Sequence, residues 1–256
     1  MLRWSINLFR IRGIQLAVHG SFWLLLAYVA YEGWRVDGTV GLIWSATALL
    51  AFFTCVVLHE LGHSFTAMHF GVGVRRILLM PIGGMAEFES IPRQPSRELL
   101  ITLAGPAVNF VIAGVLWPTV GFGSGDEYPF TVKGLAQLLL YANLAMGVFN
   151  LLPIFPMDGG RIFRALLAWR LPYLRATFWA ATVGKVLAFV AALVALFIYH
   201  HYLTAVLFAF IYFAGDVEYR MVKRRETDDA RWRGMLAQYY QAPPGDKPPI
   251  LSSQTE

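Results

Sequence analysis

Long apolar segments, each bounded by polar or turn-forming residues, alternate along most of the chain. Their length is close to the roughly 20 residues that an α-helix needs to cross a bilayer, so the pattern predicts membrane-spanning helices. The six segments lie at residues 14–31, 40–66, 99–118, 134–152, 178–199 and 202–217. We therefore expect an all-α integral membrane protein with six transmembrane helices and no large second domain.

Residues 74–89, which follow the second segment, instead alternate loosely between apolar and polar positions. Such alternation, with a turn at Gly83 and Gly84, predicts a small membrane-associated β-hairpin. An exposed edge of this hairpin could hold an extended substrate by strand addition, which would place Gly83 and Gly84 at a substrate strand. The alternative is a simple amphipathic connector between two membrane helices.

The chain changes character at residue 220, where a polar sequence replaces the apolar segments. We therefore expect two regions, a six-span membrane domain over residues 1–219 and a polar cytoplasmic tail over residues 220–256. The tail has the pattern of one short helix at 226–240, and the prolines between 243 and 249 predict a partly disordered end.

Composition and charge agree with a membrane protein and orient it. The chain is 57% hydrophobic and 14% charged, whereas a soluble domain carries about 25% charged residues. With the N-terminus inside, all 21 basic residues except Arg35 and Lys133 fall on inside segments. This bias predicts that both termini are cytoplasmic, and it assigns the positive net charge to orientation and anionic lipid, not to nucleic acid. The single cysteine, Cys55, excludes a disulfide within the chain.

Residues 59–63, toward the inner end of the second segment, read His-Glu-Leu-Gly-His. On a helix His59 and His63 lie four residues apart on one face, so both imidazoles can bind one zinc ion. Glu60 is then placed to take a proton from the attacking water. Ionisable side chains at membrane depth are costly and functional by default, so we interpret the motif as part of one catalytic Zn²⁺ site per chain.

A catalytic zinc site typically has three protein ligands, and the sequence after the fourth segment offers the third. Residues 150–160 read Asn-Leu-Leu-Pro-Ile-Phe-Pro-Met-Asp-Gly-Gly. The fourth segment runs in the same direction as the second, so Asp158 reaches the same side of the membrane as the two histidines. Irregular backbone at this depth is tolerated where it is buried in protein or lines a watered cavity. The alternative is that Asp158 caps a helix starting at Gly159.

These motifs, in this order, closely resemble the site-2 protease family of intramembrane zinc metalloproteases. Residues 104–109, 81–86 and 18–23 are similar to further elements of the family pattern, so the resemblance extends over about residues 14–217. It implies that His59, His63 and Asp158 bind zinc and that Glu60 is the catalytic base.

The resemblance also implies a compact prokaryotic form in the inner (cytoplasmic) membrane, with the active site toward the cytoplasm. Residues 70–97 are too few for the PDZ domain of many relatives, and the tail is too short for the paired CBS modules of others. We therefore expect control by neither route.

The expected function is hydrolysis of a peptide bond in or near a transmembrane segment of a membrane-protein substrate, that is, regulated intramembrane proteolysis. Asn150 and Asn109 are the uncharged candidates to hold the substrate or the oxyanion, although packing between helices explains Asn109 equally well. The alternative is a metal-ion transporter that uses the same His/His/Asp cluster, which would need polar residues along a whole crossing path. An inactive scaffold is a third interpretation, against which the intact Glu60 argues.

Overall fold

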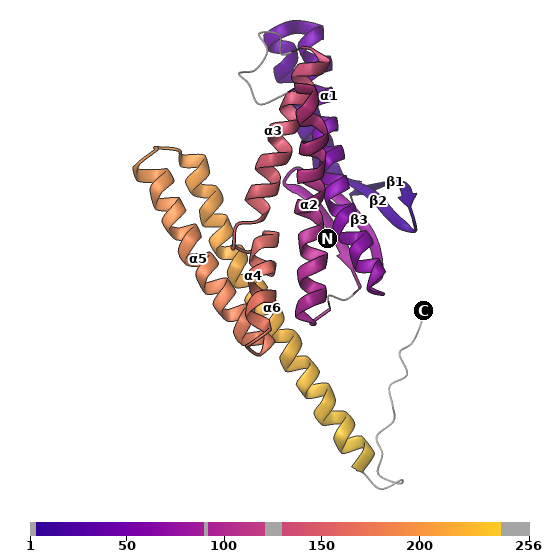
Figure 1. Ribbon diagram of the computed structural model, residues 1–256, viewed down its shortest axis with the longest axis vertical. Helices are drawn as coiled ribbons and strands as arrows, with labels where there is room; N and C mark the ends of the chain where they lie inside the picture. Colours follow the sequence, from indigo (N-terminus) through magenta and orange to yellow (C-terminus); the bar gives the residue numbers. More distant parts are fainter. Residues whose placement is uncertain (1–3, 90–91, 121–129, 242–256) are drawn as a thin grey trace.

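The computed structural model describes residues 4–89, 92–120 and 130–241, and this part is mostly helical (Figure 1). Five of its helices are long and apolar enough to cross a membrane, so the chain is an integral membrane protein. The predicted disorder of the proline-rich end falls on residues 242–256, outside the described residues. The described elements are β1 (Ser5–Ile11), β2 (Ile14–His19), α1 (Gly20–His69), β3 (Val74–Met80), β4 (Gly83–Phe88), α2 (Pro95–Val120), α3 (Val132–Asn150), α4 (Asp158–Ala168), α5 (Tyr173–Phe197) and α6 (Tyr202–Gln241).

Helix α1 is a hairpin of two antiparallel halves. Its backbone leaves helical geometry at Asp37 and Gly38, where Gly38 has a φ of 60°. The rings of Phe22 and Phe53 lie 4.8 Å apart between centroids, whereas the same stretch of straight helix would separate them by about 46 Å. The second predicted segment therefore lies in the second half of α1, and the first predicted segment lies in the first half from Gly20 onward.

Four strands form one sheet beside α1, in the order β1-β2-β3-β4. Strands β3 and β4 pair antiparallel, with Met80 opposite Gly83, which confirms the hairpin predicted over residues 74–89. The turn lies at residues 81–82, so Gly83 and Gly84 open β4 instead of forming the turn. Because β4 is the last strand in the order, one of its edges has no partner strand among the described residues.

The pairing of β1 and β2 was not predicted. Strand β2 is the beginning of the first apolar segment, and it pairs parallel with β3 and antiparallel with β1. Its residues Ile14, Leu16 and Val18 are buried against the halves of α1. A short apolar run is equally compatible with a buried strand and a helix. The pairing with β3, which lies far along the chain, therefore decides that residues 14–19 form a strand. The helix consequently begins at Gly20, where His19 accepts a hydrogen bond from the Ser21 amide.

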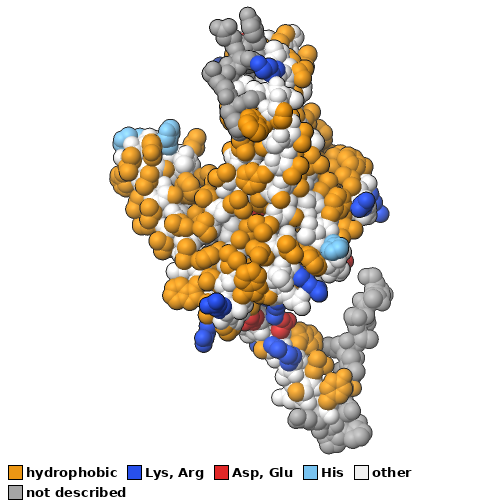
Figure 2. Space-filling model, in the orientation of Figure 1, with side chains coloured by type: hydrophobic (Ala, Val, Ile, Leu, Met, Phe, Trp, Pro, Cys, Tyr) orange, Lys and Arg blue, Asp and Glu red, His pale blue; other side chains and the backbone are white. Residues whose placement is uncertain are grey.

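Large apolar side chains cover the outside of the helices, and most lysines and arginines gather toward one end of the molecule (Figure 2). Leu203, Phe197 and Val115 are 88%, 68% and 68% exposed. Such a surface would be a liability in water, but it suits contact with lipid chains.

Helix α6 continues through the predicted tail without interruption as far as Gln241. The polar residues of the tail therefore extend the last apolar helix, and the helix predicted at 226–240 is part of it. Pairs one turn apart support this extension, including Arg220 with Asp216 at 2.6 Å and Arg233 with the Asp229 carbonyl at 3.2 Å. Figure 1 shows this part of α6 projecting beyond the other helices.

Candidate metal centre

The structure brings together the three residues predicted to bind metal. His59 and His63 lie one turn apart in the second half of α1, both are buried, and their Nε2 atoms are 3.1 Å apart. Asp158, the first residue of α4, places Oδ2 3.3 Å from His59 Nε2 and 3.2 Å from His63 Nε2.

The spacing of these three atoms fits a tetrahedral zinc site. Ligand atoms that surround zinc at about 2.0–2.1 Å in a tetrahedron lie about 3.3 Å from one another. Oδ2 of Asp158 is buried and accepts no well-oriented hydrogen bond from a described residue, although both imidazoles are close. The three donor atoms thus surround a common point, and the described part of the chain contains no second cluster of this kind.

A tightly folded segment between α3 and α4 places Asp158. Within it, the Met157 amide donates to the Ile154 carbonyl over 3.0 Å. Gly160 packs directly on this segment, because a Cβ at that position would lie 2.7 Å from a backbone nitrogen. The N-cap of α4 is Met157, so Asp158 is not the cap that the alternative interpretation supposed.

A chain of buried amides orients His59. Its Nδ1 lies 2.5 Å from Asn109 Oδ1 on α2, and Asn109 Nδ2 donates to Asn143 Oδ1 on α3 over 2.8 Å. The Asn143 amide nitrogen in turn donates to the Leu139 carbonyl. An imidazole whose Nδ1–H donates to Asn109 keeps the Nε2 lone pair for a metal. The structure therefore places Asn109 behind the ligand, with both atoms of its amide already paired.

His63 is oriented by the backbone of α2. Its Nδ1 lies 2.8 Å from the Ile101 carbonyl oxygen, which serves the same purpose as Asn109 serves for His59. Gly105, one turn later, packs against both imidazoles, and a Cβ there would lie 2.8 Å from His59 Cε1 and closer still to His63. Gly62 packs in the same way on α2, since its added Cβ would lie 2.8 Å from the Ala104 carbonyl oxygen. Glycines on both helices thus let α1 and α2 approach at the site.

Comparison with known proteins agrees with this arrangement. The sequence model of peptidase family M50 matches residues 47–134 and 125–193, which is more than half of the chain. The chain belongs to peptidase family M50. This M50 chain is also similar to the solved structure of the site-2 protease from Methanocaldococcus jannaschii, with a TM-score of 0.56 and 38% sequence identity. The match covers 84% of this chain and 95% of that one.

Two curated relatives are longer than this chain. A zinc metalloprotease of Methanocaldococcus jannaschii is 40% identical over 224 residues, which make up 87% of this chain and 62% of that protein. Stage IV sporulation protein FB of Bacillus subtilis is 28% identical over 164 residues, 64% of this chain and 51% of that protein. The chain therefore spans half to about three-fifths of the length of these curated relatives.

The remaining predicted site residues lie on α1, α3 and β4. Glu60 is half-buried and lies against β4, because a Cβ added to Gly84 would be 2.6 Å from Glu60 Cγ and 3.3 Å from its Oε1. Asn150, the last residue of α3, is half-buried, and its side chain makes no hydrogen bond to a described residue. Gly83 is the neighbour of Gly84 at the start of β4.

Inspection of the sequence missed a group of buried charges beside the M50 site. Arg164 on α4 pairs with Glu98 on α2 and Glu218 on α6. The available signal was the cost of burying charge: Glu98 immediately precedes the third apolar segment, and Arg164 follows Asp158 by fewer than two helical turns. Its pairing could not be read from the sequence, because the partners are far apart in it.

Proposed function

We propose that this M50 chain is a zinc metalloprotease that hydrolyses a peptide bond in or near a transmembrane segment of a membrane-protein substrate. The observation that carries the proposal is the convergence of His59, His63 and Asp158 at tetrahedral spacing, with Glu60 on the same helix. This combination suits metal-assisted hydrolysis, and the family membership agrees with it.

Each residue of the proposed site has a separate role in the reaction. Zinc, held by His59, His63 and Asp158, would supply Lewis-acid activation of water and of the scissile carbonyl. Glu60 accepts the proton of the attacking water and returns it to the leaving amine. Asn150, whose side chain has no partner among the described residues, donates to the oxyanion or the substrate backbone. We assign Asn109 to orienting His59.

Strand β4 is the proposed docking edge for the substrate. Peptide bonds in a helix are shielded by their own hydrogen bonds, so a transmembrane substrate has to unwind before attack. Addition of the unwound segment to the unpaired edge of β4 replaces those bonds. The contact of Gly84 with Glu60 supports this edge, because it puts the added strand next to the catalytic base.

The proposed topology has six crossings and both termini in the cytoplasm. The halves of α1 supply two crossings, and α2, α3, α5 and α6 supply one each. The metal centre then lies toward the cytoplasmic ends of α1 and α3, in the cytoplasmic membrane of a prokaryote. The distribution of basic residues supports this orientation.

The replacement Glu60→Gln tests the function directly. The purified variant should bind about one zinc per chain and lose cleavage of a membrane substrate by about a hundredfold or more, because general-base catalysis contributes about 10²–10⁴. The substrate is found by comparing the membrane proteomes of cells that carry the parent or the variant. Glu32→Gln is the matched control, since Glu32 pairs with Arg35 on the first half of α1, away from the metal centre.

The same variants discriminate the transporter. In liposomes, a transporter would carry zinc through the parent protein and retain that flux in Glu60→Gln. Undiminished cleavage in Glu60→Gln, or zinc flux that survives the change, would contradict the protease mechanism.

A further inference from the structure

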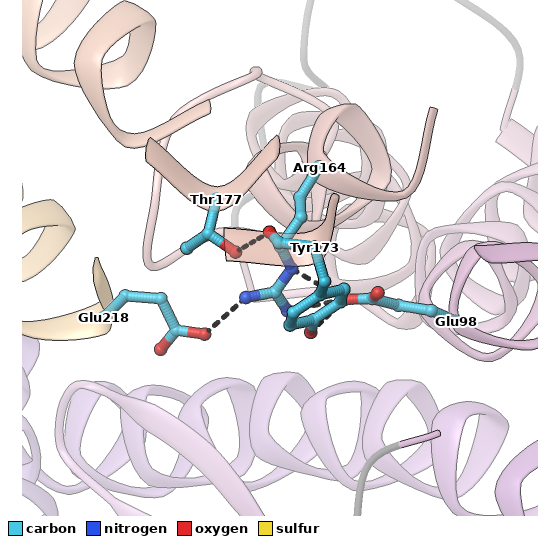
Figure 3. A network of polar contacts seen from close by, with 5 residues as sticks. All are labelled: Glu98, Arg164, Tyr173, Thr177 and Glu218. Carbon is cyan, nitrogen blue, oxygen red and sulfur yellow. Dashed lines mark hydrogen bonds and ion pairs between the residues drawn. The ribbon is translucent and has the colours of Figure 1, made fainter. Parts of the chain in front are cut away.

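Arg164 and Glu98 are the two most deeply buried charged side chains among the described residues, and they belong to one polar network (Figure 3). Arg164 is 1% exposed. Its Nε and Nη2 donate to Glu98 Oε1 over 2.9 and 2.5 Å, and its Nη1 donates to Glu218 Oε1 over 3.0 Å. One guanidinium therefore joins α4, which carries it, to α2 and α6.

Aromatic rings hold the guanidinium from other directions. The centre of the guanidinium lies 5.2 Å from the centroid of the Phe155 ring and 5.1 Å from that of Tyr173, distances typical of cation–π contact. The Tyr173 hydroxyl donates to Glu98 over 3.4 Å, and Thr177 donates to the Tyr173 carbonyl. These contacts leave Arg164 little freedom of orientation.

Two partners of Arg164, Glu98 and Phe155, lie close in sequence to residues that form or orient the metal centre. Arg164 follows Asp158 by six residues on α4, about 9 Å along a helix, and Phe155 precedes Asp158 by three residues. Glu98 precedes Ile101 by three residues on α2, and the Ile101 carbonyl orients His63. The network therefore connects the segment that carries Asp158 with the part of α2 whose Ile101 carbonyl orients His63.

We propose that Arg164 is a positioning residue, whose fork of hydrogen bonds to Glu98 holds Asp158 at ligand distance from His59 and His63. Through Glu218, the position of α6 becomes part of the same arrangement. This inference rests on the proposed metal site, although it does not depend on the identity of the substrate.

The chemistry of the Arg164–Glu98 ion pair indicates that the pair fixes the geometry of the site more than it stabilises the fold. Burying an ion pair costs desolvation that its attraction roughly offsets, and apolar replacements of both partners are often neutral. A guanidinium adds a planar set of donors in fixed directions. Here Nε and Nη2 both point at Glu98 Oε1, and Nη1 points at Glu218 Oε1, so one rigid group fixes the positions of two carboxylate oxygens. Arg161 lines the same small cavity as Glu98, which places a second positive charge near that carboxylate.

The test compares Arg164→Met, Glu98→Met and the double variant, all in the Glu60→Gln background so that cleavage plays no part. Zinc affinity is measured by competition with a chromophoric chelator, and the visible spectrum of bound Co²⁺ reports coordination geometry. We expect both single variants to lose stability and to bind Zn²⁺ at least about tenfold more weakly. The double variant should recover most of its thermal stability but keep the weak metal binding and an altered Co²⁺ spectrum.

Two further variants keep the test decisive. Arg164→Lys retains the charge without the fork, so it should bind metal more weakly than the parent even where Arg164→Met does not fold. Arg220→Gln, which removes an arginine that is 73% exposed and pairs with Asp216 on α6, should match the parent. Parental zinc affinity and Co²⁺ spectrum in the double variant or in Arg164→Lys would overturn the proposal. Either result would leave the assignment of Glu60, which the cleavage assay tests, unaffected.

Discussion

Glycines set the distances between the proposed catalytic and metal-binding residues. Gly105 faces both imidazoles, Gly62 faces the backbone of α2, and Gly84 faces Glu60. At each of these positions an added Cβ would come within 3 Å of another atom, which real Cβ atoms essentially never do. The close approach of α1, α2 and β4 therefore depends on the absence of side chains as much as on the ligands.

Gly105→Ala should disrupt the metal centre, because the new methyl group displaces the rings of His59 and His63. We expect zinc affinity to fall at least about tenfold, as for the loss of an orienting contact, with a parallel loss of cleavage. Gly114→Ala on the same helix is the control, since no atom lies within 4 Å of its added Cβ. Equal zinc affinity of the two alanine variants, measured by chelator competition, would show that Gly105 does not determine the geometry.

The spacing of His59, Glu60 and His63 could be read from the sequence because it is local to one helix. Asp158 could be placed on the same side because chain direction and charge bias give the orientation of its segment. Neither argument could find the contacts of Asn109 with His59 or of the Ile101 carbonyl with His63. Those depend on the rotation of α2 against α1, which only packing decides.

Among the elements, the hairpin within α1 shows how the membrane domain is closed. The two halves pack where Gly33 and Gly41 face each other, because a Cβ on Gly41 would meet the Gly33 carbonyl. The apolar pattern predicted two separate segments here. The structure joins them in one helical element, in which the chain reverses direction at Asp37 and Gly38. By contrast, β2 could not be told from the start of a helix until its pairing with β3 was known.

Gly41→Val should destabilise the protein by about 1–3 kcal/mol, as overpacking of a tight contact does. The added side chain forces the halves of α1 apart at their closed end, far along α1 from the metal centre. Val40→Ala is the control, because Val40 is 50% exposed on the outside of the same helix. Unfolding in mixed detergent micelles measures the difference, and unchanged stability of Gly41→Val would argue against the close contact of the two halves.

The whole molecule combines a helical membrane domain with a sheet beside it and a long projection of α6. Helices α5 and α6 pack mainly on each other, and α5 also packs on α4 (Figure 1). Glu218 and the pair of Arg93 with Asp229, at 2.8 Å, add polar connections from α6 to α4 and to the segment before α2. The orientation of this assembly in the membrane remains a proposal from the basic residues.

Single cysteines test that orientation. In a Cys55→Ala background, His201→Cys at the start of α6 should react with a membrane-impermeant maleimide in intact cells. Gly234→Cys in the α6 projection should react only after permeabilisation, because the proposed topology puts it in the cytoplasm. Both positions are exposed, whereas Cys55 is buried, so the parent serves as an unreactive control. Labelling of both new cysteines from the same side would contradict the topology.

The sequence by itself determined the class of protein, the apolar segments and the identity of the metal-binding and catalytic candidates. It did so because hydrophobic length, charge bias and the spacing of His59, Glu60 and His63 are local properties of the chain. The tertiary structure alone decided that β2 is a strand, that the three ligand atoms lie 3.1–3.3 Å apart, and that Arg164 meets Glu98. These features depend on contacts between distant segments, whose close packing has no signature in any one of them.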